Sequence, residues 1–367
     1  MLLRPTVLEV DLEQIRRNLR LFDEYTGDAA LMAVVKADCY GHGAAPCAKA
    51  AVEAGAKVLC VATVEEGIEL RDAGLSSPIL LLGYADETAL EYAVKYDLMP
   101  MVFTPENLLA CENAAKKVGK IAKIHMKIDT GMNRIGLKTE EELRDLLGLA
   151  KKCPHVESVG VMTHFATADV PESTFGDEQM ETFRKLLPVF TEYEIQPFVH
   201  AAASAAALRY PDARFDGVRA GIVMYGVDYT GTLPVRPAMT WKTRIVHLKT
   251  IRKGETVGYG RHFTAEKDTV IATLPVGYAD GYSRHFSGRA EVLIGGKRAK
   301  VAGNVCMDQI MADVTGIPCK VGDEAVLMGA QGSETVSPVE LADLAGTIPY
   351  EIMTGISKRV PRVYLHE

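Results

Sequence analysis

The segment Leu31-Met-Ala-Val-Val-Lys36 is a short apolar run that ends in a lysine. Similar β-branched, apolar runs recur from about residue 30 to residue 226, and an amphipathic stretch follows most of them. Strands that alternate with helices predict parallel βαβ units. The eight predicted strands are Leu31–Lys36, Val58–Thr63, Ile79–Gly83, Leu98–Phe103, Ile121–Ile128, Ser158–His164, Pro197–His200 and Phe215–Tyr225.

Eight parallel strands are the number that closes a (β/α)8, TIM-like barrel. A doubly wound open sheet is the alternative, but it would require a G-x-G-x-x-G turn after the first strand. The sequence there is Lys36-Ala-Asp-Cys-Tyr-Gly-His-Gly43, which favours the barrel. The predicted helices are Val64–Ala73, Glu87–Lys95, Pro105–Val118, Thr139–Lys152 and Gln179–Tyr193, several of them with N-cap or glycine end signals.

The pattern changes after about Thr232, where Pro234 and Pro237 indicate a linker. Short β-rich runs with turn signals follow, and one helix is expected after Ser337-Pro338. We therefore predict an α/β fold with an N-terminal barrel over residues 1–235 and a C-terminal, mainly-β domain over 236–367. The run Thr6–Val10 is a further strand that would pair with either domain. The strands expected in the second domain are Arg244–Thr250, Val270–Leu274, Ala290–Ile294, Met311–Val314 and Ala325–Met328.

Composition narrows the function classes. A formal net charge of −7 indicates a soluble protein and argues against a nucleic-acid partner, which would need a basic face. No apolar run is long enough to span a membrane, and residues 1–11 lack a signal pattern, so the expected location is the cytoplasm. The seven cysteines form no C-x-x-C pair and no His/Cys cluster, which predicts reduced, mostly buried thiols and no metal site.

Lys36 stands where barrel active sites are found, at the carboxyl end of a strand. One interpretation is an ordinary surface lysine just beyond the strand. The other is a Schiff-base lysine, whose amine is neutral because it is desolvated. The residue pattern alone leaves both interpretations open.

The segment Ala33-Val-Val-Lys36-Ala-Asp-Cys-Tyr40-Gly-His-Gly43 closely resembles the lysine signature of alanine racemases. Eight further motifs resemble that family in the same order along the whole chain, so the resemblance is specific. They are Lys127-Ile-Asp-Thr-Gly-Met-Asn-Arg134-Ile-Gly, Thr163-His164-Phe-Ala, Ser204-Ala-Ala, Arg219-Ala-Gly221-Ile222, Val257-Gly-Tyr259-Gly, Gly277-Tyr278-Ala-Asp280-Gly, Asn304-Val-Cys-Met307-Asp308-Gln and Pro349-Tyr350-Glu.

The resemblance implies an isomerase that uses pyridoxal 5'-phosphate to interconvert L- and D-alanine and supplies D-alanine for peptidoglycan. It also implies a homodimer with shared active sites. In such an enzyme Lys36 carries the cofactor, and Arg219 donates a hydrogen bond to the pyridine nitrogen. The phosphate contacts implied by the resemblance come from Tyr40, Ser204, Gly221, Ile222 and Tyr350, and His164 lies beside the ring. For Ser204 a plain helix N-cap is the alternative, and for Arg219 an ion pair with Asp216.

Racemisation needs a proton removed from one face of Cα and another delivered to the opposite face. The resemblance assigns Lys36 to one face and Tyr259 of the partner subunit to the other. It places His164, Arg219 and His200 in a chain of hydrogen bonds that polarises the phenol. Arg134 and the backbone of Met307 contact the substrate carboxylate. Lys127, often carbamylated in the family, orients the arginine, and the remaining supporting residues are Tyr278, for which core packing is the alternative, and Asp308.

Two departures from the family pattern bear on the substrate: Asp38-Cys39 replaces the commoner Asn-Ala, and Ala203 stands where asparagine is usual. A racemase of another small amino acid, such as serine, is therefore an alternative. A fold-related decarboxylase that uses the same cofactor is a second alternative, although no C-terminal acidic-cysteine motif of that class is present. A non-catalytic carrier of pyridoxal phosphate is a third, but carriers resemble the barrel alone.

Overall fold

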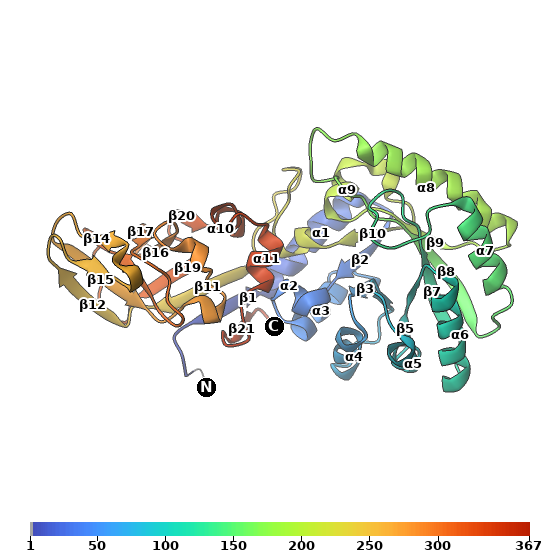
Figure 1. The fold of residues 1–367 in the computed structure, drawn as a ribbon, viewed down its shortest axis with the longest axis horizontal. Coiled ribbons are helices and arrows are strands. Elements are labelled where there is room, and N and C mark those ends of the chain that lie inside the picture. Colours follow the sequence, from blue (N-terminus) through green and yellow to red (C-terminus); the bar gives the residue numbers. More distant parts are fainter. Residues whose placement is uncertain (1–2) are drawn as a thin grey trace. The chain divides into compact units, whose positions relative to one another are not determined.

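The computed structural model describes residues 3–367, and the chain divides into two compact units (Figure 1). We call the first the barrel unit; it contains residues 15–39 and 44–236. The second, the β unit, contains the segment up to Gln14, residues 40–43, and everything from Pro237 onward. Among residues 3–367 no helix has the length and apolar character needed to cross a membrane.

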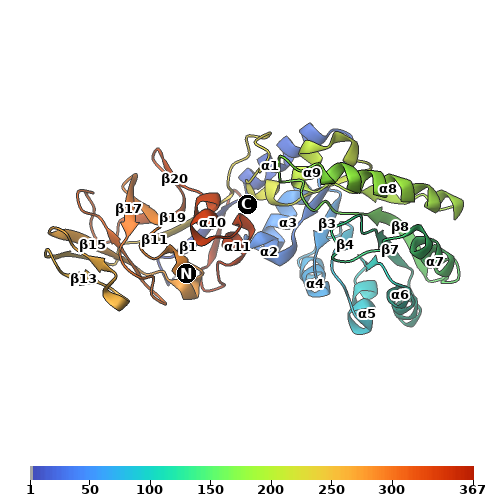
Figure 2. The same ribbon diagram turned by 45° about the horizontal axis from the view of Figure 1, so that its top comes forward.

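The barrel unit is built on parallel strands that form a closed ring, with helices α4 to α8 outside it (Figures 1 and 2). One run of paired strands has the order β10-β2-β3-β4-β5 and the other β6-β7-β8-β9. A bridge between Ala203 and Arg219 links the ends next to β9 and β10. The strands are β2 (Ala30–Val34), β3 (Val58–Val61), β4 (Ile79–Leu81), β5 (Leu98–Met99), β6 (Met101–Val102), β7 (Ala122–Lys127), β8 (Val156–Met162), β9 (Phe198–His200) and β10 (Gly217–Ala220).

The predicted (β/α)8 barrel is therefore confirmed, with differences at strand ends. The strand predicted over Leu98–Phe103 is broken at Pro100, because proline has no N–H for the ladder. The strand predicted over Phe215–Tyr225 is too long: it ends at Ala220, and a short 3-10 helix, η2 (Ile222–Tyr225), follows. The first strand ends at Val34 rather than Lys36, because the backbone turns sharply there.

The helices begin largely where their capping residues predict. Thr104 accepts a hydrogen bond from Asn107 at the start of α6, and Gly119 ends that helix in the left-handed conformation. Helix α8 begins at Phe175, earlier than predicted, α9 is the helix expected from Ser204, and α1 and α3 lie outside the predicted set. The helices of the barrel unit are α1 (Leu12–Thr26, shared with the β unit), α3 (Ala44–Glu53), α4 (Val64–Asp72), α5 (Glu87–Lys95), α6 (Pro105–Val118), α7 (Glu140–Ala150), α8 (Phe175–Glu192) and α9 (Ser204–Arg209).

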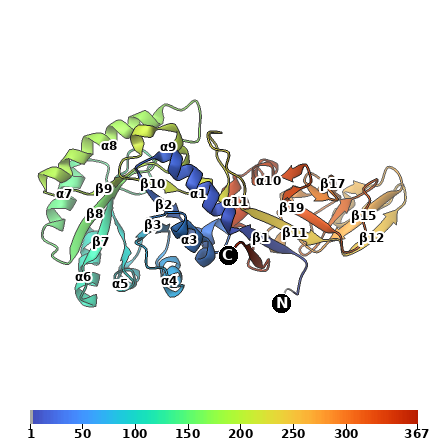
Figure 3. The same cartoon turned by 180° about the vertical axis from the view of Figure 1, so that it is seen from behind.

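The β unit contains a ten-stranded sheet with the order β12-β15-β18-β17-β16-β19-β11-β1-β21, and β20 pairs with β19 (Figure 3). The mainly-β character expected after residue 236 is thus confirmed. Its core includes Trp241, which packs edge-on against Tyr282 at 5.7 Å between ring centroids. The strands are β1 (Val7–Asp11), β11 (Met239–Arg244), β12 (His247–Ile251), β13 (Thr256–Val257), β14 (Phe263–Thr264), β15 (Thr269–Leu274), β16 (Glu291–Ile294), β17 (Lys297–Val301), β18 (Ile310–Asp313), β19 (Glu324–Gln331), β20 (Glu334–Val336) and β21 (Arg362–Leu365).

The N-terminal strand β1 pairs antiparallel with β11 and parallel with β21, so the first strand of the chain is part of this sheet. The strand predicted over Arg244–Thr250 is wrong in its bounds. The chain leaves β11 at Arg244 and enters β12 at His247, because Ile245 and Val246 bond to different neighbouring segments. The predicted helix after Ser337 is present as α10 (Pro338–Ala345), and a second one, α11 (Pro349–Thr354), follows it.

All seven cysteines are outside disulfides, and five of them are buried, as the sequence indicates. Across residues 3–367 there is no group of three or more His, Cys, Asp or Glu side chains arranged to hold a metal ion.

Candidate active site

Lys36 opens an unusual turn, α2 (Lys36–Tyr40). Ala37, Asp38, Cys39 and Tyr40 all have φ between 51 and 53°, so four consecutive non-glycine residues are left-handed. Each such residue costs about 1–2 kcal/mol relative to the right-handed form. Strain of this kind persists only where the surroundings enforce it, and it is concentrated at functional sites.

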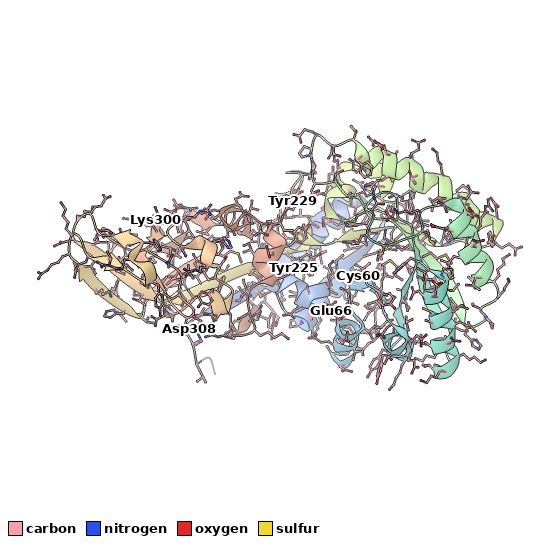
Figure 4. The ribbon with its side chains drawn as sticks, viewed as in Figure 1. Cys60, Glu66, Tyr225, Tyr229, Lys300 and Asp308 are labelled. Carbon is pink, nitrogen blue, oxygen red and sulfur yellow. The ribbon has the colours of Figure 1, made fainter. Side chains whose placement is uncertain are left out.

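The turn after Lys36 is held by two carboxylates that accept backbone hydrogen bonds. The Ala37 amide donates to Glu66 Oε1 at 2.7 Å, and the Ala44 amide donates to Asp38 Oδ1 at 2.7 Å. The second oxygen of Glu66 accepts from the Ala62 amide at 2.7 Å. Glu66 therefore ties the end of β3 and the start of α4 to the turn, and Figure 4 labels it together with Cys60 of β3.

The Lys36 amine has no hydrogen bond or ion pair with any of residues 3–367. Burial lowers the pKa of Lys36, and the positive charges of Arg134 and Arg219 lower it further, against the opposing charge of Glu66. Desolvation disfavours the charged form of an amine. The half-buried position and the absent partner fit the Schiff-base interpretation of this lysine better than the surface one.

Arg219 is 2% exposed and lies on β10 with no carboxylate partner among residues 3–367. The predicted alternative, an ion pair with Asp216, is wrong: that carboxylate accepts from the Val199 amide at 2.7 Å. Nη1 of Arg219 donates to Nδ1 and the backbone oxygen of His200, at 2.8 and 3.1 Å. Nη2 donates to the backbone oxygens of Thr163 and Ala201 and to Nδ1 of His164, at 2.9, 2.7 and 3.2 Å.

The Nε–H of Arg219 donates to no group within residues 3–367. Burial lowers the pKa of Arg219 to about 10, so the guanidinium stays charged at neutral pH. The pKa of His164 and that of His200 are both well below the ordinary value, first through burial and then through the charge of Arg219. Both imidazoles are therefore neutral beside a permanent cation.

Lys127 and Arg134 lie on β7 and in the turn after it. The Lys127 amine is buried and donates to the backbone oxygen of Ile128 at 2.8 Å. Burial lowers the pKa of Lys127 to about 7, with Arg219 and Arg134 contributing. The turn that carries Arg134 is fixed by Asp129, which accepts from the amides of Gly131 and Asn133 at 2.9 and 3.0 Å. The Arg134 side chain is exposed.

The Ser204 hydroxyl is buried and faces the segment after β10. It accepts from the amides of Gly221 and Val223 at 2.9 and 3.4 Å. Ser204 is the first residue of α9 rather than its N-cap, which is Ala203, so the N-cap alternative is wrong. The bond also explains why β10 stops: these amides point at a side chain instead of continuing a ladder. Ile222 follows directly in η2.

The remaining predicted site residues belong to the β unit. The rings of Tyr40 and Tyr350 lie 5.7 Å apart between centroids and are tilted by 42°. Gly41 makes their approach possible: a Cβ there would lie 2.4 Å from the backbone oxygen of Met353 in the same helix as Tyr350. Asp308 forms an ion pair with Arg359 at 2.7 Å.

Tyr259, Tyr278 and Met307 are large side chains that remain exposed on the β unit, at 73, 42 and 53%. Asn304 Nδ2 donates to the Tyr259 backbone oxygen at 2.7 Å, and the Tyr278 amide donates to the Cys306 oxygen at 3.1 Å. The loops carrying these residues are therefore tied together. Core packing, the alternative for Tyr278, is wrong.

Sequence reasoning missed two residues that the geometry brings into this region. Glu66 was hidden in an ordinary capping pattern, Thr63-Val-Glu-Glu66, and its contact with the turn spans 29 residues. His125 donates or accepts at Nδ1 toward His200 Nε2, 3.0 Å away. Its position two residues before Lys127 on β7 was the available signal, because alternate residues of a strand share a face.

The barrel unit thus gathers Lys36, Lys127, Arg134 and Arg219 with few acidic groups near them. Burial lowers the pKa of Lys36 and of Lys127, which favours the neutral forms of both amines beside the two arginine cations. Such a site suits an anionic small molecule and nucleophilic or proton-transfer chemistry at nitrogen. The fold and the site define a (β/α)8-barrel protein with a desolvated lysine just beyond its first barrel strand.

Comparison with known proteins narrows this class to one family. The sequence profile of the alanine racemase N-terminal domain matches residues 10–229, and that of the C-terminal domain matches residues 238–364. The alanine racemase of Halothermothrix orenii is 44% identical over 98% of this chain and 97% of its own length. Alanine racemase 1 of Bacillus subtilis is 43% identical over 99% of this chain and 93% of its own. The chain belongs to the alanine racemase family.

Solved structures agree. The alanine racemase of Bacillus anthracis with bound L-Ala-P matches with a TM-score of 0.93 and 39% identity, over 100% of this chain and 96% of that one. A histidine racemase from Leuconostoc mesenteroides also matches, with a TM-score of 0.91 and 30% identity, over 100% and 99% of the two chains.

Replacing Glu66 with alanine should destabilise the protein by roughly 0.5–2 kcal/mol, because the capping box of α4 is lost and the exposed Ala37 amide and the part-buried Ala62 amide lose their acceptor. Glu66→Gln keeps one acceptor oxygen and should cost less. Glu65→Ala, at the exposed neighbouring position, is the matched control. The measurement is the free energy of unfolding in urea, followed by circular dichroism. Equal free energies of unfolding for E66A and E65A would show that the hydrogen bonds to Glu66 do not stabilise the turn.

Proposed function

We propose that this protein racemises alanine with pyridoxal 5'-phosphate as cofactor, in a homodimer. The observation that carries the proposal is the desolvated amine of Lys36 at the carboxyl end of a barrel strand, near the buried Arg219. Within residues 3–367 neither this amine nor the Nε–H of the arginine has a hydrogen-bond partner. Membership of the alanine racemase family supports the reaction, and the proposed cellular use is supply of D-alanine for peptidoglycan in the cytoplasm.

The residues fit the cofactor. Lys36 would hold it through Nζ, and the unused Nε–H of Arg219 would donate to the pyridine nitrogen. An arginine cannot readily give up its proton, so that nitrogen would stay unprotonated. The phosphate would bind at the Ser204 hydroxyl and the Ile222 amide, together with the hydroxyls of Tyr40 and Tyr350. The Gly221 amide, which donates to Ser204 Oγ here, would turn to the phosphate when it binds. When bound, the cofactor supplies an electron sink that acidifies the proton on Cα.

Proton transfer on two faces requires two groups. We assign one face to the Lys36 amine, because burial lowers its pKa and so favours the neutral form that accepts a proton. The other face is assigned to Tyr259 of the partner subunit. An ordinary phenol is a poor base at neutral pH because its pKa is about 10. His164, held by Arg219, would donate a hydrogen bond to the phenol oxygen and so make Tyr259 easier to deprotonate. Tyr259 is widely exposed on its own unit, which supports a role toward another chain.

Substrate binding is assigned to two groups that suit a carboxylate. Arg134 offers a planar fork of N–H donors, and the backbone of Met307 offers a further contact. Tyr278, Tyr350 and Met307 are bulky, so together they would favour a small side chain such as the methyl group of alanine. Asp308 is assigned a supporting role, through its ion pair with Arg359 beside Met307.

A second substrate class is supported by one comparison. A histidine racemase shares this fold at 30% identity, so the scaffold accepts other amino acids. Serine remains the nearest alternative to alanine, because Ala203 and Cys39 depart from the family pattern beside Ser204 and Lys36. A decarboxylase using the same cofactor is the remaining alternative, and release of carbon dioxide from lysine or ornithine would identify it.

The first test is racemisation itself. The purified protein should convert L-alanine to a racemic mixture, followed by loss of optical rotation, faster than any of a panel of other L-amino acids. Borohydride treatment should add mass on the peptide that contains Lys36. Lys36→Arg should abolish both results, with a loss of about 10³-fold or more in rate, whereas Lys49→Arg at an exposed position should not. A protein that binds the cofactor but leaves every enantiomer unchanged would refute the proposal.

Tyr259→Phe should lower kcat/KM for racemisation by about 10²–10³-fold. The loss must be equal in both directions, because the two enantiomers have the same free energy. The face served by Lys36 is retained, so one enantiomer should still exchange its α-proton with solvent deuterium without inversion. Mass spectrometry after short incubations in deuterium oxide measures this exchange, with Tyr92→Phe as the control. Equal exchange of both enantiomers in Y259F would place the second base elsewhere.

Lys127 should form a carbamate with dissolved carbon dioxide, and this anion would orient Arg134. Carbamates form from the neutral amine; because burial lowers the pKa of Lys127 to about 7, the reaction should proceed above that pH and fall away as the pH drops through it. A carbamate signal should appear in ¹³C NMR spectra recorded in labelled bicarbonate. It should vanish in Lys127→Met and persist in Lys123→Met, an exposed position on the same strand. A signal that grows on acidification would contradict the assignment.

A further inference from the structure

His125 is a buried histidine to which the function described above gives no role. It lies on β7, 4% exposed, with its Nδ1 3.0 Å from Nε2 of His200. His200 in turn receives Nη1 of Arg219 at its own Nδ1, 2.8 Å away. Arg219, His200 and His125 therefore form one continuous line of hydrogen bonds across the barrel interior.

The direction of every proton in this line follows from the arginine. A guanidinium has only donors, so Nδ1 of His200 must present a lone pair to it. The proton of neutral His200 is then on Nε2, and Nε2 must donate to Nδ1 of His125. His125 consequently carries its own proton on Nε2. The same logic at the other branch makes Nδ1 of His164 an acceptor and leaves its Nε2 protonated.

His125 must be neutral for its Nδ1 to accept the proton of His200. Burial lowers the pKa of His125 to about 4, and the charge of Arg219 acts in the same direction. At neutral pH the ring therefore has one acceptor nitrogen. That nitrogen is used by His200, and the two rings meet edge-on at 5.1 Å between centroids.

Two backbone features make room for the ring of His125. The pairing of β7 with β8 shifts register between Ile124 and His125, so that Val159 is left as an extra residue. Gly160 then stands opposite His125, and a Cβ on it would lie 2.3 Å from Nδ1 and Cε1 of the imidazole. Bulges of this kind occur next to active sites, where they redirect a side chain.

We propose that His125 is a positioning residue: it accepts the Nε2 proton of His200, fixes that ring as an acceptor toward Arg219, and thereby holds the arginine's Nε–H in direction. The role rests on the proposed function only in its last step, where Nε faces the cofactor ring. A packing role would need only a ring of the same size. A positioning role needs an acceptor atom at the place of Nδ1.

The primary test reads the protons directly and requires no catalysis. The chain has nine histidines, and ¹⁵N-histidine labelling with long-range ¹H–¹⁵N correlation separates their tautomers. His200, assigned from a His200→Gln spectrum, should show a protonated Nε2 and a lone-pair Nδ1. The spectra are recorded on the protein as purified and again after removal of any bound cofactor. A His200 ring protonated at Nδ1, or at both nitrogens, at neutral pH would overturn the proposal.

Matched variants distinguish the effect of the acceptor atom of His125 from the effect of its ring. His125→Phe keeps a ring but has no acceptor, so the His200 Nε2–H resonance should lose its hydrogen-bonded shift. In His125→Asn the side-chain oxygen lies near the place of Nδ1 and should restore it. Gly160→Ala leaves His125 in the sequence and should displace its ring. If H125F and H125N shift the His200 Nε2–H resonance equally, or if neither variant shifts it, the proposed positioning role of His125 is wrong.

Kinetics then tests the last step. H125F should lower kcat for racemisation by about three- to tenfold with KM little changed, the effect of one hydrogen bond on the reacting geometry. H125N should recover to within about threefold of the parent protein. Equal losses in both variants would mean packing alone. If the tautomers are as stated but no amino acid is racemised, the proposed function fails while the assignment of His125 as the acceptor for His200 stands.

Discussion

A buried guanidinium without a carboxylate partner is the constraint around which the barrel unit is organised. Transferring an unpaired ion from water into a protein interior is costly unless hydrogen bonds replace its hydration. Arg219 meets that condition with three backbone oxygens and two imidazole nitrogens. These acceptors come from the carboxyl ends of β8 and β9, where strand ends leave carbonyl groups unpaired. The charge is thus stabilised by dipoles that carry no charge of their own.

This arrangement has a second effect, on the groups around the arginine. Burial lowers the pKa of Lys36, of Lys127 and of the three histidines, and because no acid neutralises the arginine, its charge lowers each of these pKa values further. A carboxylate at the same position would raise those pKa values and keep the amines protonated. Burial and this cation together favour the neutral forms of the amines, which are the forms that react with carbonyl carbon or accept protons.

Much of this could be predicted from the sequence, for a physical reason. Hydrophobic periodicity and capping residues are local, so they gave the eight strands, most of the outer helices and the change to a mainly-β unit. The place of Lys36 just beyond the carboxyl end of the first strand also followed, because active sites of barrels lie where strands end. Resemblance added the roles. Bounds failed where a side chain competed with the ladder, as Ser204 does after β10.

What the sequence did not show has a common cause: it depends on backbone conformation or on the direction of a proton. The four left-handed residues after Lys36 include no glycine that would have predicted this conformation. Glu66, which accepts a hydrogen bond from the turn, has the sequence pattern of an ordinary helix cap. In the sequence, His125 looks like any other residue of a strand. Only the register shift between β7 and β8, and the absence of a side chain at Gly160, show that the structure leaves space for its ring. A lysine can be located from its strand, but its orientation is set by neighbours that are distant in sequence. Local sequence patterns can therefore locate the site residues, but the left-handed turn after Lys36 and the direction of the hydrogen bonds from Arg219 to His125 are visible only in the structure.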